Sequence, residues 1–144
     1  DRLVMHTRRL IQESGALYVM ENPRATLRKQ PFMRDLDRRT VWYCRYGDTS
    51  SKPTDLWSNF FRSLECPEGW EPRPQCHNNN PHCHHDRQPR SYLKRKDLGL
   101  TTKGTTGKSN AYERSKLPPA LCLEVIRAAE RVLSSGVASS HHGR

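Results

Sequence analysis

The sequence lacks any long hydrophobic run. Hydrophobic residues make up only 33% of the 144 residues, and no apolar stretch approaches the roughly 20 residues that are needed to span a bilayer. The first residues also lack the apolar segment of a secretory signal peptide. We therefore expect a protein that is not secreted, has no membrane partner, and resides in the cytoplasm or the nucleus of its host.

Acidic residues and paired cysteines are scarce as well. Five cysteines are an odd number, which argues against a closed disulfide framework and favours reduced thiols or metal ligands. The chain has 25 Lys and Arg against 15 Asp and Glu, a formal net charge of +10. This excess favours a polyanionic partner, most often nucleic acid, although basic surfaces also serve solubility alone. The length and composition allow one domain with a modest core.

A short apolar run over residues 16–20 ends in Glu21, Asn22 and Pro23. Its β-branched and aromatic side chains predict a strand that is buried on both faces. In open α/β sheets, ligands bind just beyond the carboxyl ends of the strands, so Glu21 and Asn22 are candidate site residues. Pro23 should end the strand and hold Asn22 extended. The alternative is that Glu21 only caps a strand end in solvent.

The regions around this run predict further helices and strands of an α/β fold. Apolar residues at helical spacing predict an amphipathic helix over residues 1–14. Residues 24–36 should form two short helical pieces separated by a loop. Residues 40–46 predict a strand, and residues 54–59 should begin another strand that runs antiparallel to it.

The C-terminal part predicts one more helix. Prolines 118 and 119 suit its first turn, and an apolar stripe extends from Leu121 to about Ser134. We expect Gly136 to end this helix. Its apolar stripe should pack on the sheet.

Between the predicted sheet and the last helix, residues 65–107 show no periodicity and are rich in proline, cysteine and histidine. Loops of this length are usually functional, stapled by metal, or disordered. Thiolate and imidazole are ligands that zinc prefers. We therefore expect a structural zinc bound by Cys66, Cys76, Cys83 and one histidine. The candidates for the histidine are His82, His84 and His85, and we choose His85. The alternative is a polar loop with incidental histidines. Cys44 and Cys122 are expected to be small buried hydrophobes.

Basic residues cluster in two places. The first group follows the Glu-Asn-Pro turn, and the second surrounds Tyr92 in the irregular segment; their members are Arg24, Arg28, Lys29, Arg34, Arg38 and Arg39, then Arg87, Arg90, Lys94, Arg95 and Lys96. Phosphate contacts need only positive charge on mobile side chains, so both groups could position a DNA duplex without reading its sequence. The alternative is a solvated charged surface.

Four stretches together resemble the C-terminal part of a divergent DNA cytosine-5 methyltransferase, of the kind found in phages and large viruses. They are "LYVMENP" at 17–23, "VWYCRYGDTSSKPTDLWSNF" at 41–60, "PHCHHDRQPRS" at 81–91 and "YERSKLPPALCLEVI" at 112–126. The resemblance implies part of a Rossmann-like sheet, comprising the later strands with a terminal antiparallel hairpin. It assigns residues 1–64 to that core, 65–110 to a target-recognition-like segment, 111–135 to a C-terminal helix on the core, and 136–144 to a polar tail.

The resemblance also implies roles for individual residues. In that family, a Glu-Asn dipeptide at a strand end places its Glu on a cytosine that is flipped out of the stack. The catalytic assignment therefore falls on Glu21 and Asn22. A protonated Glu21 carboxyl that donates to N3 would make C6 more electrophilic. The base or backbone contacts implied are Tyr46, Lys52, Arg24, Arg90 and Lys94.

The match to the next motif of the family is incomplete. Tyr46-Gly47 fits it, but Ser50, Lys52 and Thr54 stand where the family has one Gln and two Arg. Lys52 can still supply a cation, whereas Thr54 cannot replace an arginine contact.

Two parts of such an enzyme are missing from the sequence. The chain contains no glycine-rich turn for S-adenosylmethionine, and no Pro-Cys dipeptide to carry the nucleophile. Under the resemblance, the chain is a piece that binds DNA and is completed by an N-terminal half, and it should not methylate alone. The alternative is a small zinc-stabilised, basic nucleic-acid-binding module without catalysis. An amino-group methyltransferase is disfavoured, because the stretch that begins at Glu21 lacks the required second proline and aromatic.

Overall fold

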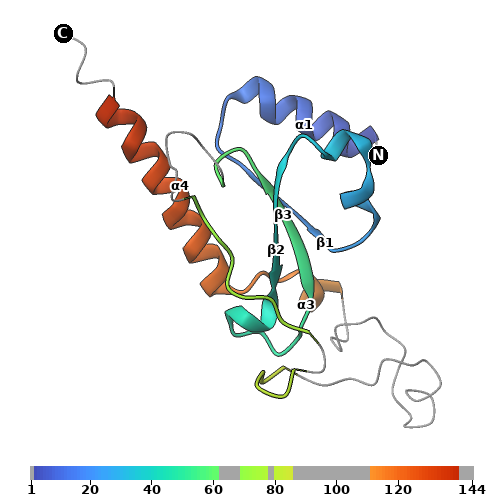
Figure 1. The fold of residues 1–144 in the computed structure, drawn as a ribbon. Coiled ribbons are helices and arrows are strands. Elements are labelled where there is room, and N and C mark those ends of the chain that lie inside the picture. Colours follow the sequence, from blue (N-terminus) through green and yellow to red (C-terminus); the bar gives the residue numbers. More distant parts are fainter. Residues whose placement is uncertain (1, 62–68, 78–79, 86–110, 140–144) are drawn as a thin grey trace.

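The computed structural model describes residues 2–61, 69–77, 80–85 and 111–139. Its centre is a three-stranded sheet formed by β1 (Val19–Pro23), β2 (Asp37–Trp42) and β3 (Pro53–Ser58), in the order β1-β3-β2. In Figure 1, α1 (Arg2–Ser14) and α4 (Pro119–Ser139) lie on opposite sides of this sheet. The described residues therefore form an α/β fold, as the sequence predicts.

The last strand in the chain, β3, lies between the other two strands and is antiparallel to both. Five of its six residues are buried, including Asp55 and Trp57. The predicted antiparallel pairing between the second and third strands is confirmed. Whether this small sheet belongs to a Rossmann-like domain stays a prediction.

Strand β1 differs from the strand that the sequence predicts. It begins at Val19 and continues through Pro23, and none of its residues is buried. Among the described strands it pairs only with β3, so one of its edges has no strand beside it. Residues 16–18 do not enter the ladder, because the side-chain amide of Asn59 bonds the Ala16 carbonyl oxygen (3.0 Å) and the Tyr18 backbone N–H (3.2 Å) instead. The predicted strand that is buried on both faces is therefore wrong for β1.

The prediction of a strand over residues 40–46 is also corrected. Strand β2 ends at Trp42, and a 3-10 helix, η3 (Tyr43–Tyr46), follows it. Tyr43 and Tyr46 are both buried. Because these two residues are three positions apart, their side chains point to the same side of a 3-10 turn. In a strand, where successive side chains alternate, they would point to opposite faces. Gly47 ends η3 with a φ of 89°, a conformation that glycine adopts readily.

The helical predictions are largely confirmed. Helix α1 has the expected bounds, and two 3-10 turns, η1 (Thr26–Lys29) and η2 (Pro31–Met33), are the two short helical pieces. The short helix α3 (Ala111–Ser115) was not predicted. Helix α4 continues past Gly136 to Ser139, so glycine does not end it; a helical glycine costs only about 1 kcal/mol, which the surrounding helix tolerates.

The core lies between α4 and the sheet with η3. Leu121 and Ala128 of α4 join a cluster of buried side chains that includes Tyr43 and Phe61, which confirms that α4 packs on the sheet. The apolar face of α4 is only partly covered by the sheet and η3. Ile126 and Leu133, which belong to this face, remain more than half exposed. Within the described residues, no helix has the length and apolar character that crossing a membrane requires.

Candidate functional site

Three sulfur atoms and one imidazole meet beside η3. The ligand atoms of four side chains lie within 4.8 Å of one another, and these residues, the Cys/His cluster, are Cys44, Cys76, Cys83 and His85. Cys76 and His85 are buried, and Cys44 and Cys83 are half-buried. The cluster contains no carboxylate and can hold a metal ion.

The backbone of the irregular segment folds in tight turns that bring its three cluster residues together. The Asn80 N–H donates to the His77 carbonyl oxygen (3.0 Å), and the Cys83 N–H donates to the Asn80 carbonyl oxygen (3.4 Å). The Asn80 side chain donates to the Cys76 sulfur (3.4 Å). Asn80 therefore sets both the chain path and the surroundings of one thiol.

Burial and mutual contact shift the pKa values of two of these thiols in opposite directions. Burial, reinforced by the neighbouring sulfurs of Cys83 and Cys76, raises the pKa of Cys44. Burial also opposes ionisation of Cys83, but hydrogen bonds from the backbone and side chain of His85, and from the other two thiols, outweigh it and lower the pKa of Cys83 to about 6. The cluster can therefore hold one thiolate near neutral pH.

Three of the four zinc ligands chosen from the sequence belong to the Cys/His cluster. The fourth, Cys66, lies outside the described residues, so its role stays a prediction; Cys44 is the fourth member of the cluster among the described residues. The expectation that Cys44 is a small buried hydrophobe in a strand is corrected, because Cys44 is half-buried and lies in η3 with its sulfur in the cluster. His82 and His84 are exposed and lie outside the cluster.

Glu21 lies within β1, opposite Leu56 of β3, and not beyond the end of a strand. Its carboxylate accepts a hydrogen bond from the Tyr43 hydroxyl (3.2 Å) and lies 3.7 Å from Nζ of Lys52. The Lys52 ammonium also lies 4.8 Å from the centre of the Tyr43 ring. The Glu21 side chain keeps 30% of its surface exposed, so the carboxylate is held in place but remains accessible. We call Glu21, Tyr43 and Lys52 the Glu21 site.

Burial is the largest cause of the raised pKa of Tyr43, and the nearby Glu21 carboxylate raises this pKa further. Tyr43 therefore stays protonated at neutral pH, as a hydrogen-bond donor to Glu21 must be. Lys52 supplies the positive charge beside the same carboxylate. Among the residues that are expected from the sequence to contact a base or the DNA backbone, and that the structure describes, only Lys52 contacts Glu21.

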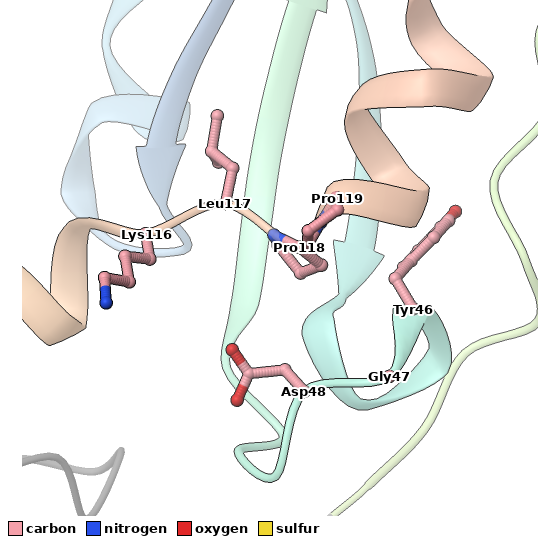
Figure 2. Close-up of a pocket in the computed structure, with 7 residues that line it drawn as sticks. All are labelled: Tyr46, Gly47, Asp48, Lys116, Leu117, Pro118 and Pro119. Carbon is pink, nitrogen blue, oxygen red and sulfur yellow. The ribbon is translucent and has the colours of Figure 1, made fainter.

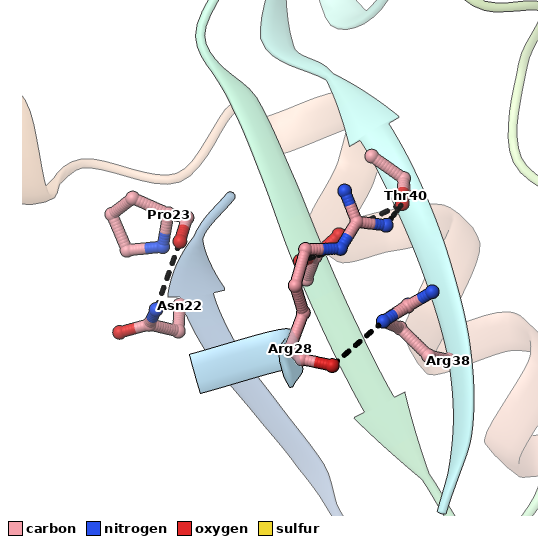
Figure 3. Close-up of polar contacts among 6 residues, drawn as sticks. Asn22, Pro23, Arg28, Arg38 and Thr40 are labelled. Carbon is pink, nitrogen blue, oxygen red and sulfur yellow. Dashed lines mark hydrogen bonds and ion pairs between the residues drawn. The ribbon is translucent and has the colours of Figure 1, made fainter. Parts of the chain in front are cut away.

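The other residues expected at the site lie elsewhere. The Asn22 side-chain amide donates to the Pro23 carbonyl oxygen (2.8 Å), as Figure 3 shows. The Tyr46 hydroxyl accepts a hydrogen bond from the Arg73 backbone N–H (2.9 Å), and its side chain is buried. Arg24 stacks over the ring of Trp42, with 5.8 Å between its guanidinium carbon and the ring centre. Arg90 and Lys94 lie outside the described residues.

Half of the first basic group serves the fold itself. Arg28 pairs with the fully buried Asp55 (Nε to Oδ2, 3.3 Å) and lies within 3.4 Å of the Thr40 hydroxyl. Arg38 donates to the Arg28 carbonyl oxygen (3.4 Å; Figure 3). Arg39 pairs with Asp37 and with Glu71. The exposed members of this group, which could meet phosphate, are Arg24, Lys29, Arg34 and Arg38.

A pocket of about 340 Å³ lies beyond η3. Tyr46, Gly47 and Asp48 line one side. The other side is lined by residues 116–118, which link α3 to α4, and by Pro119, the first residue of α4 (Figure 2). Asp48 also accepts the backbone N–H of Ser50 (2.8 Å). None of the Glu21-site or cluster side chains lines this pocket.

Comparisons with protein-family models, with curated proteins and with solved structures found no match to this chain.

Proposed function

We propose that the chain is the DNA-binding and base-contacting C-terminal part of a DNA cytosine-5 methyltransferase. The observation that carries the proposal is the Glu21 site. It holds a carboxylate of the Glu-Asn-Pro stretch whose side chain is 30% exposed, which accepts a hydrogen bond from Tyr43 and pairs with Lys52. A carboxylate that is fixed by neighbours yet accessible is what recognition of a flipped base requires.

In this proposal, Glu21 bonds the cytosine edge. An ionised carboxylate accepts a hydrogen bond from the exocyclic amine of cytosine, and a protonated carboxyl donates to ring N3, which draws electron density away from C6. The Tyr43 hydroxyl and the Lys52 ammonium fix the rotamer of Glu21 before the base arrives. Lys52 and Tyr43 are positioning residues in this account, because they act through Glu21.

DNA is the partner that the charge favours. The net charge of +10 supplies a sequence-independent attraction to phosphate. Arg24 directly follows β1 and is exposed, so it can reach a phosphate close to the Glu21 site. Arg90 and Lys94 would add to the same interface from the basic part of residues 86–96.

Methyl transfer would need groups that this sequence does not contain. S-adenosylmethionine supplies the methyl group in the complete enzyme, and a cysteine after proline would attack C6. An N-terminal half that carries the adenosylmethionine loop and the Pro-Cys dipeptide would provide both. We therefore propose that this chain binds DNA by itself and methylates cytosine only together with such a half.

Complementation tests this proposal. The chain would be mixed with an N-terminal half of a cytosine-5 methyltransferase, and transfer of labelled methyl groups to cytosine-containing DNA would be measured. We expect transfer in the mixture, and a loss of about 10²–10⁴-fold with Glu21→Gln, the range typical of a general acid. Glu13→Gln is the matched control, because Glu13 lies on the exposed surface of α1. Absence of transfer in every pairing would overturn the proposal.

A second candidate is a small zinc-stabilised, basic nucleic-acid-binding module, and the Cys/His cluster favours it. In this case the chain would need no second half, and Glu21 would have only a structural role. DNA binding that weakens steeply with salt, requires bound zinc and is unchanged by Glu21→Gln would support this candidate over the first.

A further inference from the structure

We infer that the Cys/His cluster is a closed tetrahedral zinc site in which Cys44 is the fourth ligand, and that the zinc fastens the irregular segment to η3. The inference specifies the metal centre of the second candidate function, and it holds equally if the chain is part of a methyltransferase.

The donor atoms suit zinc. Three thiolates and one imidazole form a common structural zinc set, with Zn–S distances of about 2.3 Å and Zn–N distances of about 2.0–2.1 Å. A tetrahedron with those distances separates a sulfur from a nitrogen by roughly 3.6 Å. The Cys76 sulfur lies 3.7 Å from Nδ1 of His85, a separation that is close to an edge of that tetrahedron.

The surroundings suit a structural site. Four protein ligands complete a tetrahedron and leave no open position for a substrate, which distinguishes structural from catalytic zinc. Cys76 and His85 are buried. The Asn80 amide that donates to the Cys76 sulfur at 3.4 Å is the kind of outer hydrogen bond that orients a ligand and balances its charge.

The position of Cys44 determines what the zinc would do. Cys44 lies in η3, directly after a strand of the sheet, whereas the other three ligands lie in a segment without helix or strand among its described residues. Arg73 makes a second link between the same two parts, because its side chain donates to the Arg45 carbonyl oxygen (2.7 Å) and its backbone N–H donates to the Tyr46 hydroxyl (2.9 Å). Zinc bound to all four ligands would therefore join the irregular segment to the sheet at neighbouring residues of η3.

Cys44 is also the neighbour of Tyr43, which donates to Glu21. A metal bond to Cys44 would restrict the η3 backbone from which both side chains project. The zinc would thus hold the Tyr43 hydroxyl on the Glu21 carboxylate without touching either residue. This consequence rests on the geometry of η3 and not on any catalytic role of Glu21.

Metal binding by the whole chain tests the inference. The chain would be reduced, freed of metal with a chelator, and titrated with Zn²⁺ and with Co²⁺, whose visible absorption reports tetrahedral thiolate ligation. We expect one metal per chain and thiolate-to-cobalt charge-transfer bands. Cys44→Ser and Cys83→Ser should each weaken binding by more than the 10–100-fold that is typical of outer-shell changes, and Cys122→Ser, a cysteine of α4 outside the cluster, should bind as the unmodified chain does.

Two results would overturn the inference. One is loss of binding with Cys66→Ser together with full binding by Cys44→Ser, which would make Cys66 the fourth ligand. The other is a disulfide within the cluster that persists after reduction and metal treatment, detected as the loss of two hydrogen atoms in the mass of the denatured chain. If Cys44→Ser does not fold, Cys66→Ser still tests the fourth ligand, because it should bind metal as the unmodified chain does. Neither measurement involves DNA or methyl transfer, so the outcome is independent of the proposed function.

Discussion

The sheet with η3 and the irregular segment, of which residues 69–77 and 80–85 are described, are held together in different ways. The sheet has two antiparallel ladders and a buried aromatic core. The described part of the segment has neither helix nor strand, and its contacts with the rest of the protein come from single side chains, among them Trp70, Glu71, Arg73 and the cluster residues. Damage to the sheet should therefore unfold the whole protein, whereas damage to the segment's contacts should release the segment alone.

The largest effect is expected at Phe61, where the two regions meet. This side chain is fully buried and packs on Phe60 (5.1 Å between ring centres) and on Trp70 of the segment (5.0 Å). Phe61→Ala should lower the free energy of unfolding by about 3–5 kcal/mol, since it leaves a cavity in the core. Urea denaturation measures this loss. Leu3→Ala, at a side chain that is 77% exposed, is the control; a similar loss in both variants would refute the account of the core.

A large effect is also expected from the buried ion pair of the sheet. Asp55 is fully buried, accepts the Thr40 hydroxyl (2.8 Å) and pairs with Arg28. Asp55→Asn would leave the Arg28 charge without its partner and should cost about 3–5 kcal/mol. Glu13→Gln breaks the exposed Arg9–Glu13 pair on α1 and should cost less than about 1 kcal/mol. Equal losses of stability in the two variants would show that burial does not determine how much each ion pair stabilises the fold.

The fold could be predicted from the sequence wherever neighbouring residues determine it. The periodicity of residues 2–14 predicts α1. The run of β-branched and aromatic residues from Thr40 predicts the end of β2, although residues 43–46 of that run form η3 instead. Prediction failed where a distant side chain decides the structure. The Asn59 amide, far along the chain, takes the hydrogen bonds of residues 16 and 18 and moves the start of β1 to Val19.

The candidate site was predictable in the same partial way. Cys76, Cys83 and His85 are close in sequence, and their types alone indicate a metal site. Cys44 joins them only through the folded arrangement of η3, so the sequence favoured the nearer Cys66. The odd cysteine count was the one signal that another thiol could be a ligand. Likewise, the sequence singles out Glu21 but cannot show that Tyr43 and Lys52 are its partners.

A moderate and local effect is expected at Arg73. Its side chain donates to the Arg45 carbonyl oxygen and pairs with Glu124 of α4 (2.7 Å). Arg73→Ala should cost about 1 kcal/mol, after allowance for a side chain that is 44% exposed. Hydrogen exchange should accelerate in residues 69–77 and stay unchanged in β3. Arg127→Ala, at an exposed position of α4, should change neither region; faster exchange in β3 of Arg73→Ala would mean that the two regions unfold together.

The smallest effect should come from the Tyr43 hydroxyl, the contact that links η3 to β1. Tyr43→Phe removes one hydrogen bond to Glu21 and should cost about 1 kcal/mol at neutral pH. Burial raises the pKa of Tyr43 above its usual value of 10. Below pH 10 the tyrosine is protonated in both the folded and the unfolded chain, so its stabilising contribution is complete there. As the pH rises past 10, the unfolded chain ionises first and the contribution is lost.

Urea denaturation at pH 9, 10 and 11 would measure this loss for the unmodified chain and for Tyr43→Phe. The decline in stability above pH 10 should be shallower in the variant, because phenylalanine cannot ionise. It should not vanish, since burial also raises the pKa of Tyr18 and of Tyr46. An identical decline in both proteins would place Tyr43 in contact with solvent. A shallower decline in the variant would show that the Tyr43 hydroxyl is buried against the Glu21 carboxylate in solution. In that case η3 belongs to the same stable region as the sheet.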